Sequence, residues 1–215
     1  MNSFVITIYG NKQSEAAAQR CMSSSKRFGV ESFNFWATVP KDDPVKQLAE
    51  LGIPTANFYE KYSRPENCMS AFLSHYKLWE ICQKTGNGMI IFEHDAVVVD
   101  DLPVNANFDK VMNIGKPSYG RFNVPTHLAV GPLVSKPYFP GAHAYMIKPQ
   151  GAKALMDKAK ECGGPTDIFL NIKNFPWLQE FNPWPVECRD SFTTIQNETG
   201  CLAKHNYAKD TYEIV

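Results

Sequence analysis

Short apolar runs and longer helical stripes alternate along the chain. Residues 4–9 and 89–92 are almost continuous apolar runs that end in turn-forming or charged residues, and such runs are typical of buried strands. Residues 33–37 alternate between apolar and polar side chains, and residues 141–147 form a further, mostly apolar run. The pattern therefore predicts strands in these four segments.

The longest predicted helix begins at Pro65 and ends before Gly86. Its apolar residues recur at spacings of three and four, and so form one wide apolar face. These residues are Met69, Phe72, Leu73, Tyr76, Trp79 and Cys82. Further helices are expected over residues 14–28, 44–51 and 149–162 and from residue 166 onward, where Ser, Thr, Pro and Gly stand at positions that start or stop helices.

The order of these elements predicts the fold class. Strand, helix, strand, helix and strand follow one another up to residue 92, which favours an α/β protein with a central, mostly parallel sheet. Prolines interrupt residues 102–140, where we expect loops with short strands near residues 119–124. Residues 176–215 show no strong period, and no repeat or linker divides the chain. We therefore expect a single domain over residues 1–215.

Composition narrows the classes of function. The 215 residues carry 22 Lys and Arg against 22 Asp and Glu, and this zero net charge argues against a general polyanion binder. No apolar segment approaches the roughly 20 residues of a membrane span, and no secretion signal is recognisable, so we expect a cytoplasmic protein. The 6 cysteines form no C-x-x-C pair, which favours reduced, buried thiols over a disulfide framework or structural zinc.

Candidate chemistry stands where the apolar run 89–92 ends, at Glu93-His94-Asp95. Ligands of α/β sheets gather at the carboxyl ends of strands. Two carboxylates separated by one residue project to the same side of an extended chain, where they can hold a hard divalent cation. The alternative is a solvated turn, because acidic residues are common at strand ends.

Three blocks of sequence together resemble glycosyltransferase family 25, which includes lipopolysaccharide sugar transferases and collagen galactosyltransferases. Residues 68–95 read CMSAFLSHYKLWEICQKTGNGMIIFEHD, with a Ser-His pair and a Trp on the helix and an acidic strand end. Residues 141–155 read GAHAYMIKPQGAKAL, and residues 165–170 read PTDIFL. The blocks occur in the family's order and span most of the chain. His94 departs from the family pattern, in which Asp is usual at this position.

The resemblance implies a Rossmann-like, GT-A type nucleotide-diphospho-sugar transferase domain. The implied reaction is an inverting, metal-dependent transfer of a sugar from a UDP-sugar or related donor to a hydroxyl of a glycan or lipopolysaccharide. Glu93 and Asp95 would hold the donor and a divalent cation, with Mn²⁺ expected and Mg²⁺ as the alternative. His94 either adds a ligand or points into the sheet. His205 is a candidate third metal ligand, because C-terminal segments of such folds often close over the diphosphate.

Other candidate residues each have a structural alternative. We expect Asp167 to be the general base, although Asp is also a preferred helix cap. For His75 the resemblance implies a supporting catalytic role that braces the metal-bearing strand, whereas a lone His on an apolar face is more often a core residue. By fold analogy Gly10 and Asn11 face the nucleotide. His143 would contact the donor or acceptor sugar.

Three alternative functions remain open from the sequence. A compact transferase of this type can modify a hydroxylated base in DNA, although the balanced charge lowers the case for DNA. A chain that keeps the fold but lacks turnover would be a nucleotide-sugar-binding module, with His94 as the sign of the loss. A metal-dependent phosphohydrolase would cleave donors without preference for the sugar.

Overall fold

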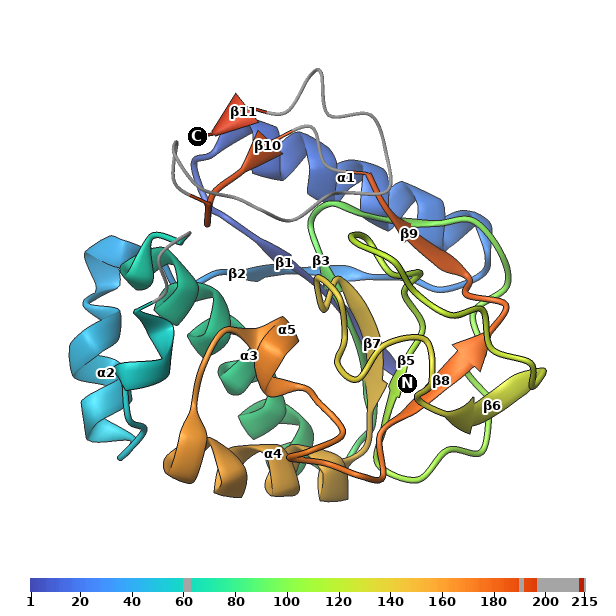
Figure 1. Cartoon of the computed structure of the whole chain (residues 1–215). Coiled ribbons are helices and arrows are strands. Elements are labelled where there is room, and N and C mark those ends of the chain that lie inside the picture. The colour runs from blue at the N-terminus through green and yellow to red at the C-terminus, as the bar shows by residue number, and fades with distance from the viewer. Residues whose placement is uncertain (60–62, 190–191, 197–212, 215) are drawn as a thin grey trace.

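The computed structural model describes residues 1–59, 63–189, 192–196 and 213–214. A seven-stranded sheet lies between α1 on one face and helices α2 to α5 on the other (Figure 1). The helices are α1 (Lys12–Arg27), α2 (Pro44–Glu50), α3 (Pro65–Thr85), α4 (Pro149–Cys162) and α5 (Thr166–Phe169). The strands of the main sheet are β1 (Asn2–Thr7), β2 (Phe33–Trp36), β3 (Met89–Glu93), β5 (Val111–Asn113), β6 (Ala129–Pro132), β7 (Ala144–Ile147) and β8 (Gln179–Asn182).

The strand order of the main sheet is β2-β1-β3-β7-β5-β8-β6. β1 pairs in parallel with β2 and β3, and β5 pairs in parallel with β8, whereas β7 and β6 run antiparallel to their neighbours. Five of the seven strands therefore point in one direction, which confirms the predicted α/β class with a mostly parallel sheet. The chain leaves β1 toward β2 and later returns to β3 on the other side of β1, which creates a topological switch point between β1 and β3.

Two smaller sheets lie on the α1 side of the molecule (Figure 1). β4 (Ala96–Val98) pairs antiparallel with β9 (Val186–Cys188), and β10 (Phe192–Thr193) pairs in parallel with β11 (Glu213–Ile214). β4 continues the chain directly beyond β3 and a two-residue turn. The segment after the central strand is therefore covered by the C-terminal part of the chain.

Successive side chains of β3 point to opposite faces of the sheet and so contribute to the core on both faces. Ile90 and Phe92 pack on the α1 side, whereas Met89 and Ile91 pack on the side of α3 and α4. Successive side chains of a strand point to opposite faces, so a strand that is covered on both faces needs apolar residues at nearly every position. This requirement explains the continuous apolar run that predicts the strand.

Helix α3 carries the aromatic core on the second face. Its Phe72 ring lies 5.3 Å from that of Phe58, 5.6 Å from Trp79 and 5.4 Å from Phe169, all in edge-on geometry. Pro65 starts the helix, and Gly86 ends it in the left-handed region with φ of 69°. The predicted limits of this helix are confirmed.

The sequence prediction is wrong in two places. Residues 120–124 form no strand, and the short strands of this region are instead β5 and β6 on either side of it. β8 and β9 lie in the region where the sequence shows no period. Each strand has only three or four residues, which is too short for a period to be recognised.

Among the described residues, Cys21, Cys68 and Cys82 are buried free thiols. No helix in the described part of the chain has the length and apolar character needed to cross a bilayer.

Replacing Phe72 with Ala should lower the free energy of unfolding by about 3–5 kcal/mol, because the ring is fully buried among aromatic neighbours that cannot all collapse into the space. Urea denaturation measures this change. Phe33→Ala is the matched control: Phe33 is 52% exposed on the edge strand, and its loss should cost less than about 1 kcal/mol. Equal losses in the two variants would contradict the assigned core.

Candidate functional site

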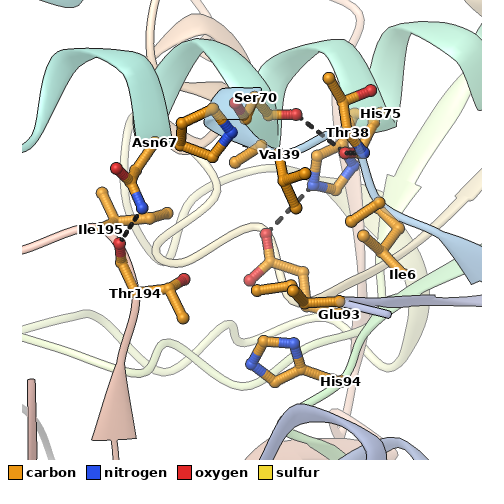
Figure 2. Close-up of a pocket in the computed structure, with 15 residues that line it drawn as sticks. Ile6, Thr38, Val39, Asn67, Ser70, His75, Glu93, His94, Thr194 and Ile195 are labelled. Atoms are coloured by element: carbon orange, nitrogen blue, oxygen red, sulfur yellow. Dashed lines mark hydrogen bonds and ion pairs between the residues drawn. The ribbon is translucent and has the colours of Figure 1, made fainter. Parts of the chain in front are cut away.

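A pocket opens at the carboxyl ends of β1, β2 and β3 (Figure 2). This is the topological switch point, where open α/β sheets bind their ligands. The N-terminal half of α3 forms one wall, and residues 194–195 lie opposite it. The fold therefore places a cavity where the sequence predicts the chemistry.

The pocket combines apolar walls with a few polar groups. The apolar lining residues are Ile6, Ile8, Ala37, Val39, Pro40, Ala71 and Ile195. The polar lining residues are Thr38, Asn67, Ser70, Ser74, His75, Glu93, His94 and Thr194. Glu93 is the only acidic residue among these described lining residues, which include no Lys or Arg. Such a pocket suits an uncharged ring with hydrogen-bonding groups better than a bare anion.

Two polar residues of α3 bring hydrogen-bonding groups to the pocket wall. The Ser70 hydroxyl is buried, and within the described chain Ser70 Oγ makes no hydrogen bond. Asn67 Nδ2 donates to the Thr194 carbonyl at 2.7 Å and so ties the helix to the segment across the pocket. A buried hydroxyl without a protein partner is costly unless a ligand or water satisfies it. Ser70 is therefore a candidate ligand contact, which the sequence analysis missed because Ser inside a helix carries no signal of its own.

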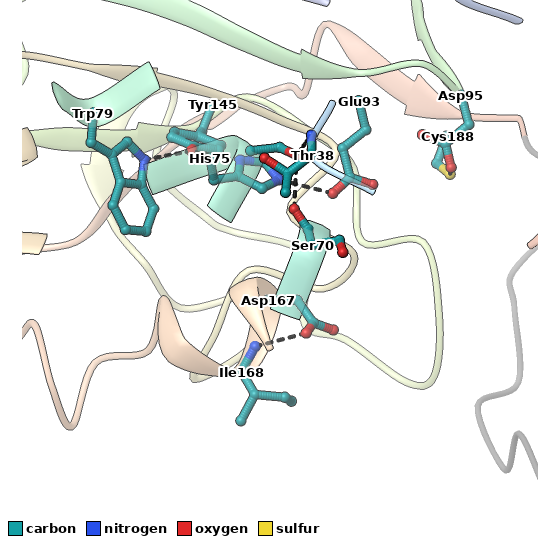
Figure 3. A network of polar contacts seen from close by, with 11 residues as sticks. Thr38, Ser70, His75, Trp79, Glu93, Asp95, Tyr145, Asp167, Ile168 and Cys188 are labelled. Carbon is teal, nitrogen blue, oxygen red and sulfur yellow. Dashed lines mark hydrogen bonds and ion pairs between the residues drawn. The ribbon is translucent and has the colours of Figure 1, made fainter. Parts of the chain in front are cut away.

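Glu93 ends β3 at the pocket and is held by a buried histidine from α3. His75 Nε2 lies 3.1 Å from Glu93 Oε1, while the His75 ring is only 1% exposed (Figures 2 and 3). Burial lowers the pKa of His75 to about 3, so the ring is neutral at pH 7. A neutral ring that carries its hydrogen on Nε2 donates to the Glu93 carboxylate and fixes its direction. His75 thus has the contact expected of a residue that braces the acidic strand end.

His94 lies at the edge of the pocket instead of inside the sheet. Its Nδ1 is 3.1 Å from the Ser14 hydroxyl, and its ring stacks on Phe192 at 5.2 Å with an angle of 13°. Burial lowers the pKa of His94, although the charge of Asp95 acts in the opposite direction. The ring therefore connects α1, the strand end and the C-terminal segment around the pocket.

Asp95 does not continue the alternation that ends at Glu93. His94 and Asp95 form a turn, and the buried Asp95 carboxylate accepts a hydrogen bond from Cys188 Sγ at 3.1 Å. Figure 3 shows this pair apart from the His75–Glu93 pair. The expectation of two carboxylates on one side of an extended chain is wrong for this reason: side-chain alternation holds only as long as the strand does.

Asp167 stands at the start of α5, as predicted, but does not line the pocket. Its Oδ2 accepts a hydrogen bond from the Tyr119 hydroxyl at 2.6 Å, and its Oδ1 accepts one from the Ile168 N–H at 2.9 Å. Burial raises the pKa of Asp167, and these hydrogen bonds partly oppose the shift. Helix α5 packs on α3, whose N-terminal half forms the pocket wall.

The other predicted contacts lie outside the pocket lining. Asn11 caps α1 by accepting hydrogen bonds from the Gln13 and Ser14 N–H groups, and Gly10 supplies a turn with φ of 77°. His143 is buried, and burial lowers the pKa of its ring. His205 lies outside the described residues.

The predicted cation would not find a complete set of protein ligands in this part of the chain. Within the described ranges, no three His, Cys, Asp or Glu side chains form a group that could hold a metal ion. The donors at the strand end are still of the right kind: a pocket carboxylate at Glu93 and a buried Asp95 Oδ1 that accepts no hydrogen bond from described residues. Magnesium-type ions are often held by one or two carboxylates together with substrate phosphates and water. The residues fit a cation that is shared with a bound diphosphate.

Comparison with known proteins adds no further constraint. No protein-family model matches the chain, and no curated protein sequence matches it. Function is therefore inferred from the pocket, its charge and the sequence motifs.

The unfolding free energy should fall as the pH drops from about 6.5 to 5, because the unfolded chain binds a proton at His75 that the folded protein excludes. The contribution of this residue has an upper limit of about 1.4 kcal/mol per pH unit. Denaturant titrations at several pH values measure the slope. His75→Gln should flatten it, since the substituted side chain does not titrate, while the buried His94 and His143 contribute equally to both proteins. Identical slopes would contradict a neutral, buried His75.

Proposed function

We propose that this protein is an inverting, metal-dependent glycosyltransferase of the GT-A type, similar to glycosyltransferase family 25. The observation that carries the proposal is the pocket at the β1–β3 switch point, where Glu93 is the acidic residue of the described lining and is held by the neutral His75. Both residues of this pair, His75 and Glu93, belong to the block 68–95 that resembles the family. The donor is a nucleotide-diphosphate sugar, with a UDP-sugar as the first choice.

The uncharged part of the donor suits the apolar lining residues of the pocket. A nucleoside ring would pack among residues such as Ile8 and Val39 and hydrogen-bond to the buried Ser70 hydroxyl. Next to the pocket, the exposed rings of Tyr9 and Trp36 lie 5.2 Å apart in edge-on geometry, and exposed aromatic faces stack on bases and sugars.

The charged part of the donor needs a counter-charge that the described lining residues do not supply. They include no Lys or Arg, and Glu93 would repel a diphosphate. A bound Mn²⁺ or Mg²⁺ would offset the negative charge that develops on the leaving diphosphate. Glu93 would hold this ion from the pocket lining, with His94 at the pocket edge as a further ligand.

Asp167 lies outside the described pocket lining, so the acceptor hydroxyl would reach beyond the pocket and give its proton to this carboxylate. A base works best when its pKa lies near the working pH, and burial raises the pKa of Asp167 in that direction. The hydrogen bonds from Tyr119 and the Ile168 N–H fix the orientation of the carboxylate. Direct attack on the face opposite the leaving group would invert the anomeric centre. The acceptor is a glycan or lipopolysaccharide hydroxyl.

Release of UDP from a panel of UDP-sugars in the presence of Mn²⁺ tests the reaction. We expect slow hydrolysis of at least one donor, loss of the signal with chelator, and a fall of about 100-fold or more in Glu93→Gln. Glu80→Gln, which changes an exposed carboxylate on α3, is the matched control and should keep full activity.

The outcomes of the panel separate the alternatives. Cleavage of every donor at one rate, whatever the sugar, would identify a phosphohydrolase. Mn²⁺-dependent binding of UDP without turnover of any donor or acceptor would identify a binding module. Failure to bind or cleave any donor would overturn the proposal.

Asp167→Asn should lower the rate of sugar transfer about 10²–10⁴-fold and leave UDP affinity unchanged, because the amide keeps the size of the side chain but cannot take a proton. Initial rates and calorimetric UDP binding, both with Mn²⁺, measure the two effects. Asp157→Asn, on the exposed face of α4, is the control. An unchanged rate in Asp167→Asn would remove Asp167 from the proposed mechanism.

A further inference from the structure

A chain of buried hydrogen bonds runs behind Glu93, away from the pocket. Trp79 Nε1 lies 2.8 Å from the Tyr145 hydroxyl, which lies 2.9 Å from His75 Nδ1. His75 Nε2 then lies 3.1 Å from Glu93 Oε1 (Figure 3). Trp79 and Tyr145 are fully buried, so no solvent competes for these groups.

The direction of the chain follows from the chemistry of its members. The Trp79 indole nitrogen is a donor only, so the Tyr145 oxygen accepts from it. Burial raises the pKa of Tyr145 well above its ordinary value, so its hydroxyl keeps the one proton it has to give. Donation of that proton to His75 Nδ1 leaves the ring hydrogen on Nε2, which faces the carboxylate acceptor. The reverse assignment would set a lone pair of His75 against the Glu93 carboxylate.

The fold brings these four residues together from three elements. His75 and Trp79 are one helical turn apart on the inner face of α3. Tyr145 of β7 is opposite Ile91 of β3, and the two residues lie on the same face of the sheet as Glu93, two positions beyond Ile91. The chain of donors is therefore part of the contact between α3 and the sheet.

We infer that Trp79 and Tyr145 are positioning residues that act through His75 to hold Glu93 in one orientation at the pocket. The inference rests on the proposed function for the role of Glu93, but the hydrogen-bonded chain itself does not depend on a ligand. The pocket lining includes His75, whereas Trp79 and Tyr145 are not part of it. Neither of these two residues therefore touches the pocket. Each donor polarises the next one, which strengthens the final hydrogen bond to the carboxylate.

For binding, the consequence is that the Glu93 carboxylate already has a fixed orientation before a cation binds. Groups that hydrogen-bond to metal ligands fix their orientation, and their loss typically costs about 10–100-fold in metal affinity or activity. Tyr145→Phe removes one oxygen at the middle of the chain and leaves the aromatic ring in the core. Tyr76→Phe is the matched control, because Tyr76 is another buried tyrosine, on α3, that has no part in the chain.

Nitrogen-15 NMR of the histidine rings in the full chain, without ligand, tests the chain of donors. The His75 signals are assigned by their loss in His75→Gln. We expect a neutral ring at pH 7 with its hydrogen on Nε2, and an Nδ1 signal that moves to the position of a non-hydrogen-bonded nitrogen in Tyr145→Phe but not in Tyr76→Phe. A hydrogen on Nδ1, a charged ring, or an Nδ1 signal unaffected by Tyr145→Phe would overturn the inference.

The positioning role is tested by titrating UDP in the presence of Mn²⁺. Tyr145→Phe should weaken Mn²⁺-dependent UDP binding about tenfold, whereas Tyr76→Phe should leave it unchanged. Unchanged binding in Tyr145→Phe would overturn the positioning role, even if the NMR result supports the hydrogen bonds. A wild-type chain that does not bind UDP would count against the proposed function, whereas the NMR outcome would still decide whether the chain of donors exists.

Discussion

Burial of β3 on both faces is the constraint on which the rest of the structure depends. Met89 to Phe92 alternate between the α1 side and the α3 side, and each side chain completes one half of the core. The next position, Glu93, continues the same alternation and therefore brings a carboxylate to the α3 side. A partly buried charge needs a partner. His75 meets this need, and the apolar helix face that carries His75 becomes one wall of a polar site.

Helix α3 contributes residues to both the core and the pocket. Phe72 and Trp79 fill the aromatic core, whereas Asn67 and Ser70 face the pocket in the N-terminal half. His75 belongs to both regions, because it is fully buried and yet reaches the carboxylate at the pocket. A substitution that shifts this helix would therefore change stability and the orientation of Glu93 together. The control variants are needed for this reason.

The main elements were predictable because their patterns are long and locally consistent. The apolar face of α3 and the apolar run of β3 each show a clear pattern, and turn or cap residues mark their ends. β8 is short, and its position depends on pairing with β5 and β6, which are distant in sequence. The bracing role of His75 was expected from the resemblance to glycosyltransferase family 25, because its place on the apolar helix face by itself favours a core residue. Tyr145 was not predicted as its second partner, because that contact depends on strand register. The turn at His94-Asp95 was only the alternative in the sequence analysis, because acidic residues after an apolar run fit both a turn and an extended pair of ligands.

The distribution of charge at the pocket bears on the proposed cation more directly than the net charge does. The chain is neutral overall, yet the part of the pocket lining that the structure describes contains one carboxylate, two histidines whose pKa values are lowered by burial, and no Lys or Arg. An anionic ligand would therefore meet a site that repels it unless it brings positive charge. The turn after Glu93 separates the second carboxylate, so that the described residues hold no ready three-ligand site. A divalent ion would thus complete its coordination with phosphate oxygens. In this arrangement ion and donor depend on each other for binding, and the fixed orientation of Glu93 is the protein's own contribution.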